Sequence, residues 1–329
     1  MRSITPLMDL VVQSTQGETM GTTWSVRAVL PVELSLQTWH DGIQAALDLV
    51  DGQMSTYKPQ SDLSRFNSAP AGTWHVLPTE CFHVVKHALS VARDSGGAYD
   101  PTVGPLVNLW GFGPDASRYE PPSSEAMAAA SERVGWWKLR LDEATHSLYQ
   151  PGGIYLDLSS VAKGYSVDLV GQYLDGLGMG AWLVEVGGEL KGKGTKPDRS
   201  SWRIGVERPG AARGAVEHAD QLSQVLTLSG RAIATSGDYR RHFTADDVRY
   251  SHHIDPRTGR PVAHKVASVS VLASDAMHAD PIGTLMTVLG PEQGLPWASE
   301  RGLAVMFILH GANGLEERLS PAFAAALAS

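Results

Sequence analysis

The chain has 329 residues, enough for one large domain or two ordinary ones. Its 43% hydrophobic and 19% charged residues are typical of a soluble globular protein, and its net charge of −8, with no run rich in Lys and Arg, disfavours a nucleic-acid partner. Cys81 is the single cysteine, which excludes an internal disulfide and a thiolate metal cluster.

The N-terminal residues 1–20 lack the sustained apolar core and the small-residue cleavage site of a signal peptide. No stretch of the chain reaches the roughly 20 apolar residues that a membrane-spanning helix needs. The sequence as written therefore predicts a cytoplasmic protein without a membrane span.

Helices are expected in the first part of the chain. Residues 37–54 place apolar side chains on one helical face, namely Trp39, Ile43, Leu47, Val50 and Met54. A second helix is expected from Pro78-Thr79 to Gly96-Gly97, with Cys81 as a small buried side chain. A third is expected over residues 123–134.

Strands dominate the middle of the chain. Residues 154–158 alternate like a strand and lead into a helix with the apolar stripe Val161, Tyr165, Leu169 and Tyr173. Further strands are expected over residues 181–190, 201–207, 224–229, 231–236, 266–273 and 302–309. Helices at both ends of a strand-rich middle predict an α+β fold with mixed or antiparallel sheets flanked by helices.

No break in composition separates two domains, and no repeat has a fixed period. We expect one domain over residues 20–329, preceded by an N-terminal extension of residues 1–19. Residues 208–221, rich in Gly, Pro and Arg, are expected to form a surface loop.

Two glycine-rich or hydroxyl-rich stretches are candidates for ligand binding. In GGAYDPTVGPLVNLWGFG (96–113), Pro101 and Pro105 argue against a helix interior, and the aromatics could grip a flat ring or simply pack in a rigid loop. In DLSSVAKG (157–164), hydroxyls and Lys163 at a helix start suit an anion, although Ser159 or Ser160 could instead cap the helix.

Two further stretches are candidates for ligand binding, one because of its paired glycines and the other because of its oxygen-bearing side chains. Gly187-Gly188 in VEVGGELKGKG follows an apolar strand, but it is not the fingerprint of a dinucleotide-binding fold. Asp280 and Thr284 can share one helix face, where a carboxylate and a hydroxyl suit Mg²⁺. Asp280 is equally suited to be a helix N-cap with Pro281 in the first turn.

The stretch YSHHIDPRTGRP (250–261) holds two adjacent histidines before an Asp-Pro turn. If this segment is an extended strand, His252 and His253 point to opposite faces, so only one of them can reach a given site.

Taken in order, the motifs resemble those of the ApbE family of FAD:protein FMN transferases. The resemblance runs from about Met20 to Leu309 and rests on MGTTW at 20–24, MSTYKPQSDLSRFN at 54–67, the 96–113 and 157–168 stretches, Gly187-Gly188, IATSGDYRR at 233–241, HHIDPRTGRPV, and the Asp280/Thr284 pair. It implies a single-chain α+β fold that binds FAD and Mg²⁺. The implied activity attaches the FMN half of FAD to a Thr or Ser hydroxyl of an acceptor protein and releases AMP.

The same resemblance implies a set of site residues. His252 would carry the proton, while His253 would face the other way. FAD would contact Met20, Tyr57, Ala98, Tyr99, Asp100, Ser159, Lys163 or Tyr165, and Ile254. The metal would be held by the Ala162 carbonyl, Asp280 and Thr284.

Two other functions use the same residues. An FAD pyrophosphatase would let water replace the acceptor hydroxyl and yield FMN and AMP. A protein that only binds or stores FAD would need no base beside the pyrophosphate, so His252, Asp280 and Thr284 together favour an enzyme.

The resemblance also describes the acceptor protein. Acceptors of the family carry an Asp closely followed by a Ser/Thr-Gly-Ala-Ser/Thr signature.

Overall fold

The computed structural model describes residues 10–31, 35–113, 120–209, 222–237, 242–245, 248–312 and 314–328. An antiparallel eight-stranded sheet lies at the centre, with the strand order β1-β2-β6-β7-β10-β15-β16-β17. Its strands are β1 Leu10–Thr19, β2 Thr22–Pro31, β6 Trp182–Val186, β7 Glu189–Lys193, β10 Arg231–Gly237, β15 Val266–Ala273, β16 Ala304–Gly311 and β17 Gly314–Leu319.

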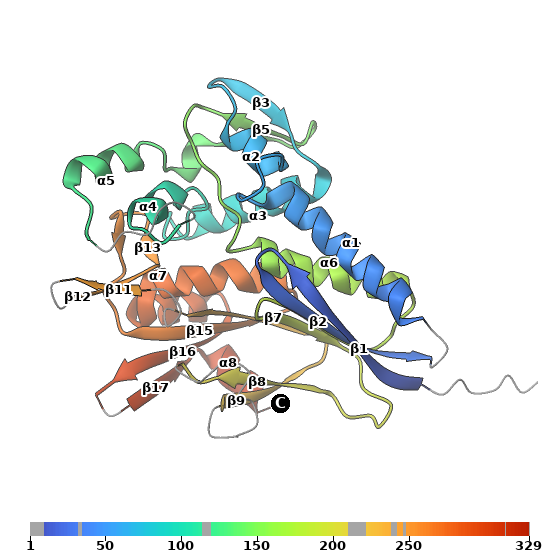
Figure 1. Cartoon of the computed structure of the whole chain (residues 1–329). Helices are drawn as coiled ribbons and strands as arrows, with labels where there is room; N and C mark the ends of the chain where they lie inside the picture. The colour runs from blue at the N-terminus through green and yellow to red at the C-terminus, as the bar shows by residue number, and fades with distance from the viewer. Residues whose placement is uncertain are drawn as a thin grey trace, which may run out of the picture.

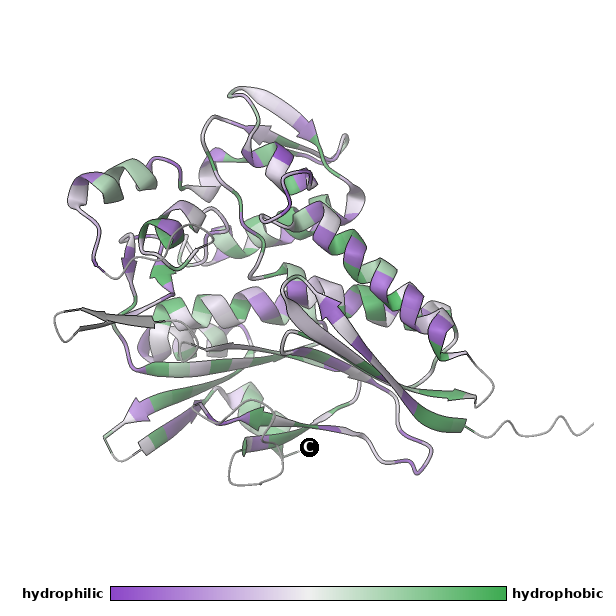
Figure 2. Ribbon diagram, in the orientation of Figure 1, coloured by the Kyte–Doolittle hydropathy of each residue, from purple (hydrophilic) through white to green (hydrophobic). Residues whose placement is uncertain are grey.

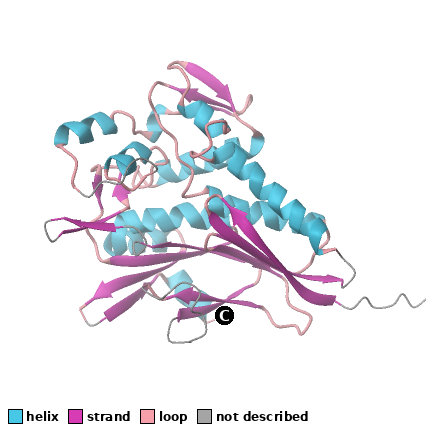
Figure 3. Cartoon of the chain, in the orientation of Figure 1, coloured by secondary structure: helices cyan, strands magenta, loops and turns pink. Residues whose placement is uncertain are grey.

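Most helices lie on one side of this sheet, above it in Figure 1, and Figure 3 shows the same layering by element type. They are α1 Leu36–Met54, α2 Asp62–Asn67, α3 Thr79–Asp94, α4 Gly104–Leu109, α5 Ser124–Ser131, α6 Ala162–Gly176 and α7 Ala276–Glu300. The other side is covered by α8 Pro321–Leu327 and the hairpin of β8 Trp202–Glu207 with β9 Leu222–Leu228. The predicted α+β class with antiparallel sheets is confirmed.

Small elements surround the helical layer. They are the sheet of β3 Thr73–Val76, β5 Ser147–Gln150 and β4 Arg140–Asp142, the 3₁₀ turn η1 Trp136–Lys138, the pair β11 His242–Ala245 and β12 Val248–Ser251, and the pair β13 Ile254–Asp255 and β14 Arg260–Pro261. No helix among the described residues is both long and apolar enough to cross a membrane.

The sheet is buried on both faces near its middle. Seven of the eight residues of β15 and five of the eight residues of β16 are buried, and Figure 2 shows both strands as largely hydrophobic. One face packs against α3, α6 and α7, and the other packs against α8, β8 and β9. The first six residues of β16, Ala304–Leu309, accordingly form a continuous apolar run, whereas β15 also buries the small hydroxyls of Ser268 and Ser270.

The sheet begins earlier than the domain boundary expected at Met20. Residues 10–19 form β1 and pair with β2 along their whole length, from Leu10 opposite Pro31 to Thr19 opposite Thr22. Met20 and Gly21 form the two-residue turn with φ of 47° and 69°, the left-handed pair that a tight antiparallel hairpin prefers. The boundary between extension and domain stays a prediction.

The helices predicted from periodicity are present. The expected face of α1, from Trp39 to Met54, is buried, and Cys81 is buried in α3. The third helix is shorter than predicted, because α5 ends at Ser131 and Glu132 already acts as its C-cap.

The strand predicted over residues 154–158 is wrong. Its side chains alternate between buried and partly exposed, as expected, but the backbone joins no ladder. Asn67 instead exchanges two hydrogen bonds of 2.8 Å with the backbone of Leu156, and Gln150 does the same for Ile154 at 3.0 and 3.3 Å. Side-chain amides replace a neighbouring strand here, which satisfies the buried backbone.

Two predictions around proline and serine also need correction. Residues 104–109, in the stretch expected to avoid helix, form α4 with Pro105 in its first turn, where the missing N–H costs nothing. Neither Ser159 nor Ser160 caps α6, because the N-cap is Val161 and has no side-chain cap bond.

The α7 helix begins four residues before the N-cap considered at Asp280. Asp275 is the N-cap, and its carboxylate accepts from the His278 N–H at 3.0 Å. Asp280 and Pro281 therefore lie inside the helix, so the N-cap interpretation of Asp280 is wrong. The helix is interrupted at Gly290, with φ 68° and ψ 173°, and resumes at Pro291.

Candidate active site

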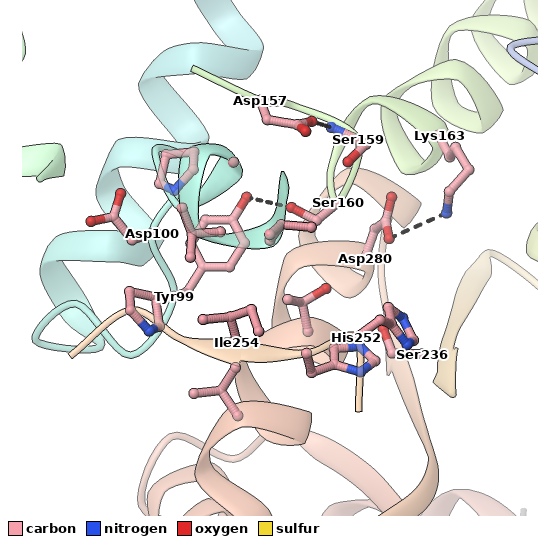
Figure 4. A pocket seen from close by; sticks show the side chains of 18 of the residues that line it. Tyr99, Asp100, Asp157, Ser159, Ser160, Lys163, Ser236, His252, Ile254 and Asp280 are labelled. Atoms are coloured by element: carbon pink, nitrogen blue, oxygen red, sulfur yellow. Dashed lines mark hydrogen bonds and ion pairs between the residues drawn. The ribbon is translucent and has the colours of Figure 1, made fainter. Parts of the chain in front are cut away.

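A cavity of about 370 Å³ opens between the helical layer and the sheet. Its walls come from the 98–107 segment, the start of α6, the neighbouring ends of β7 and β10, the 252–256 segment, and α7 (Figure 4). Its polar lining includes Asp157, Ser159, Ser160, Lys163, Glu189, Thr235, Ser236, His252, His253, Asp280 and Thr284. Residues 238–241 of the IATSGDYRR stretch and residues 210–221 of the expected surface loop fall outside the described residues.

Asp280 and Thr284 lie one helical turn apart on α7 and both line the cavity. Asp280 is only 4% exposed, and its Oδ2 accepts from the backbone N–H of Gly164 at 3.0 Å. The Thr284 hydroxyl makes no hydrogen bond with any described residue, whereas the hydroxyl of Thr287, three residues further along the helix, donates to the Gly283 carbonyl at 2.9 Å. The alternative in which Thr284 bonds backward is therefore not observed.

Lys163 lies between two carboxylates at the start of α6. Its Nζ is 2.5 Å from Glu189 Oε1 and 3.7 Å from Asp280 Oδ1. Burial alone would lower the pKa of Lys163, but Asp280 and Glu189 outweigh it and raise the pKa above its ordinary value. Burial raises the pKa of Glu189 to about 7, with Lys163 opposing the rise and Asp280 adding to it.

Tyr99 and Asp100 occupy the opposite wall. The Tyr99 hydroxyl is 3.0 Å from that of Ser160, and burial raises the pKa of Tyr99 above its ordinary value. Asp100 is turned into its own loop, where Oδ1 accepts from the N–H and hydroxyl of Thr102 and Oδ2 accepts from the Trp136 N–H. Both carboxylate oxygens of Asp100 are therefore already hydrogen-bonded, and the residue stabilises the loop that forms this wall of the cavity.

The two histidines do not point to opposite faces. Residues 252 and 253 fall between the end of β12 and the start of β13, and their ring centroids are 4.0 Å apart at an angle of 45°. Both residues line the cavity. Burial, followed by His252 and His264, lowers the pKa of His253 well below its ordinary value, so its ring is neutral at neutral pH.

The family model that matches this chain is described as the ApbE family, and it covers residues 20–307. The chain belongs to the ApbE family. A protein of Vibrio cholerae named FAD:protein FMN transferase is 40% identical over 308 residues, which are 93% of this chain and 90% of that protein. A protein of Escherichia coli with the same name is 36% identical, covering 95% and 89% respectively. The predicted membership in this family of enzymes is confirmed.

Solved ApbE structures share the whole fold. The apo form of the Pseudomonas stutzeri flavinyl transferase ApbE superposes with a TM-score of 0.88 at 37% identity and covers 99% of each chain. The Vibrio cholerae flavin transferase ApbE superposes with a TM-score of 0.86 at 37% identity, covering 97% of this chain and all of that one.

Most residues that the ApbE resemblance implied come together in the cavity: Ala98, Tyr99, Asp100, Ser159, Lys163, His252, Ile254, Asp280 and Thr284. Four implied residues lie outside its lining: Met20, Tyr57, Ala162 and Tyr165. As ligand-binding residues, all of these stay predictions.

The four outlying residues differ in their surroundings. Met20 lies at the β1–β2 turn, with its sulfur 3.9 Å from the Ser166 hydroxyl, and Tyr57 is 69% exposed. The Ala162 carbonyl already accepts from the Ser166 hydroxyl at 2.8 Å, so a metal there would have to share it. Tyr165 is buried, with its ring 6.1 Å from that of His83 on α3.

Glu189 is a cavity residue that the sequence interpretation missed. It follows Gly187-Gly188 directly, in a stretch considered only for its glycines. The available signal was an acidic residue placed directly after the paired glycines, at the start of a strand.

The oxygen atoms that Asp280 and Thr284 present to the cavity fit Mg²⁺, which keeps several of its water ligands, better than a metal ion that is coordinated only by protein side chains. Among the described residues, no group of three or more His, Cys, Asp or Glu side chains is placed to hold a metal. One carboxylate and one free hydroxyl on a helix face suit an ion that keeps several waters and binds substrate phosphates. Asp280 and Thr284 would therefore hold it.

Proposed function

We propose that this protein catalyses Mg²⁺-dependent transfer of the FMN half of FAD to a Thr or Ser hydroxyl of an acceptor protein, with release of AMP. The observation that carries the proposal is that one cavity brings Asp280 and Thr284 of α7 together with Lys163 and the histidine pair. Oxygen donors for a cation, a fixed ammonium and a proton acceptor are the groups that phosphoryl transfer requires.

The pyrophosphate of FAD would bind between α6 and α7. Lys163 remains protonated because its pKa is raised, so it places a positive charge beside the phosphates. When bound to Asp280 and Thr284, Mg²⁺ would neutralise the charge that develops on the phosphate oxygens. Tyr99 and Ile254 offer apolar walls that suit a flat ring.

The proton of the acceptor hydroxyl would move to His252. The hydroxyl oxygen forms a bond to the FMN phosphorus, the bond from that phosphorus to the bridging oxygen breaks, and AMP leaves with the bridging oxygen. A hydroxyl is a poor nucleophile until a base takes its proton, and an imidazole is suited to this near neutral pH.

The test uses purified protein, FAD and Mg²⁺, with and without a protein carrying an Asp followed by a Ser/Thr-Gly-Ala-Ser/Thr signature. We expect AMP release to depend on that acceptor, and mass spectrometry to detect covalent FMN on it. AMP release at the same rate without any acceptor would replace this proposal with an FAD pyrophosphatase. Binding of FAD without AMP in either mixture would contradict both.

Isothermal titration provides a second measurement. FAD should bind more tightly than FMN, because the AMP half adds contacts in the polar part of the cavity. Equal affinities would contradict the placement of the pyrophosphate in this cavity.

A further inference from the structure

A cluster of three ionisable side chains, Lys163, Glu189 and Asp280, lies at the floor of the cavity, where α6, α7 and β7 meet. The Lys163 ammonium is much closer to Glu189, at 2.5 Å, than to Asp280, at 3.7 Å. The Glu189 and Asp280 side chains are 3% and 5% exposed, whereas that of Lys163 is 30% exposed. One ammonium thus serves two buried carboxylates and is bonded to only one of them.

Glu189 is held in place by the backbone before it. It opens β7 directly after Gly187 and Gly188, whose φ values are 61° and 108°. A Cβ on Gly187 would lie 3.2 Å from Cδ of Lys163, so glycine leaves room for the lysine stem to reach Glu189. The second oxygen of Glu189, Oε2, is buried without any hydrogen-bond partner, so Lys163 is the only cation that the described residues offer to this carboxylate.

We propose that Glu189 is a positioning residue: it holds the Lys163 ammonium away from Asp280 and so leaves Asp280 Oδ1 available to a divalent cation. This inference rests on the proposed function, in which Asp280 and Thr284 hold Mg²⁺. It adds a role for Glu189 that the metal ligands themselves do not imply.

The physical argument is a competition for one carboxylate oxygen. Asp280 Oδ2 is occupied by the Gly164 N–H, which leaves Oδ1. An ammonium-to-carboxylate bond is about 2.7–2.9 Å long. Lys163 would therefore need to move by only about 1 Å to pair fully with Oδ1 and occupy the place of the cation. Its flexible stem allows that movement once Glu189 loses its charge.

The test measures binding of Mn²⁺ alone, an ion that shares the preference of Mg²⁺ for oxygen ligands, by electron paramagnetic resonance of the free ion. In Glu189→Gln, the affinity for Mn²⁺ should fall by about 10–100-fold, the usual loss when a residue behind a metal ligand is changed. In the double variant Glu189→Gln with Lys163→Met, the competing ammonium is gone, and most of the affinity should return. A purely structural role of Glu189 would not produce this rescue.

Asp175→Asn is the matched control. The carboxylate of Asp175 on α6 forms an ion pair of 2.9 Å with Lys193 on β7. This pair links the same helix and strand as the Lys163–Glu189 pair, but neither of its residues lines the cavity. The affinity of Asp175→Asn for Mn²⁺ should equal that of the parent, and the melting temperature of each variant reports whether the fold is kept.

Three results would contradict the inference. An unchanged affinity in Glu189→Gln, or a double variant as weak as the single one, would overturn the role of Glu189 and leave the proposed function standing. A parent protein that binds no Mn²⁺ would overturn both this role and the metal site on which the proposed function depends.

Discussion

The backbone N–H of Gly164 donates a hydrogen bond of 3.0 Å to Oδ2 of Asp280 and so joins the first turn of α6 to α7. The contact is possible because residue 164 has no side chain. A Cβ there would lie 2.2 Å from the Ala276 carbonyl oxygen and 2.9 Å from Cβ of Asp280. The position of the carboxylate thus depends on a glycine in the neighbouring helix.

Gly164→Ala should therefore separate the two helices. Overpacking of a tight contact typically costs about 1–3 kcal/mol, so the melting temperature should fall, and AMP release should fall because Asp280 moves. Gly176→Ala, in the last turn of the same helix, meets no atom within 4 Å and should leave both quantities unchanged or raise the stability slightly. Equal melting temperatures for the two variants would refute the packing argument.

Asp280→Asn and Asp275→Ala should separate binding of the cation from capping of the helix. Asp280 lies inside α7, so its replacement should abolish Mg²⁺-dependent AMP release with little change in melting temperature. Asp275 is the N-cap, and its replacement should cost about 1 kcal/mol of unfolding free energy. Thermal melts and AMP assays on both variants test this, and retained turnover in Asp280→Asn would exclude Asp280 as a metal ligand.

His252→Ala should lower the rate of FMN transfer by about 10²–10⁴-fold and leave FAD binding nearly unchanged. His253→Ala should have the smaller effect, because burial disfavours the protonated form of its ring and makes it the weaker proton acceptor, although the change removes the ring packed against His252. Single-turnover rates together with FAD titrations distinguish the two variants. If His253→Ala loses more, the roles of the two residues are exchanged.

Acid should destabilise the fold through His87. Burial first, and then His278, lower the pKa of His87 from 6.5 to about 4, while Asp275 opposes this. The unfolded chain therefore binds a proton that the folded chain does not, so this contribution to stability is complete above about pH 6.5 and is lost as the pH falls towards about 4.

His278 changes the stability with pH in the opposite direction. Asp275 raises the pKa of His278, so the stabilisation that His278 provides is greatest in acid and is lost as the pH rises. In His87→Gln the amide can still donate to the Met277 backbone but does not titrate. Its unfolding free energy should consequently fall less between pH 7 and pH 4 than that of the parent. Parallel curves from denaturant titrations would contradict the assignment.

Local patterns in the sequence were sufficient to predict the elements whose apolar residues recur with the period of a helix or a strand. The apolar spacing from Trp39 to Met54 predicted α1, and the apolar run of β15 predicted a strand, because burial against a core selects which side chains must recur. The motif residues Lys163, His252 and Asp280 were also named in advance, although 117 positions separate the first from the last.

Tertiary structure alone decided which partners these residues have. The extended segment at 154–158 is satisfied by Asn67 and Gln150 instead of a strand, and the break between β12 and β13 brings His252 and His253 to the same cavity. The pairing of Lys163 with Glu189 follows from the meeting of α6 with β7. Periodicity records which face of an element is buried, but a bond between distant side chains depends on how whole elements pack, and no local pattern encodes that.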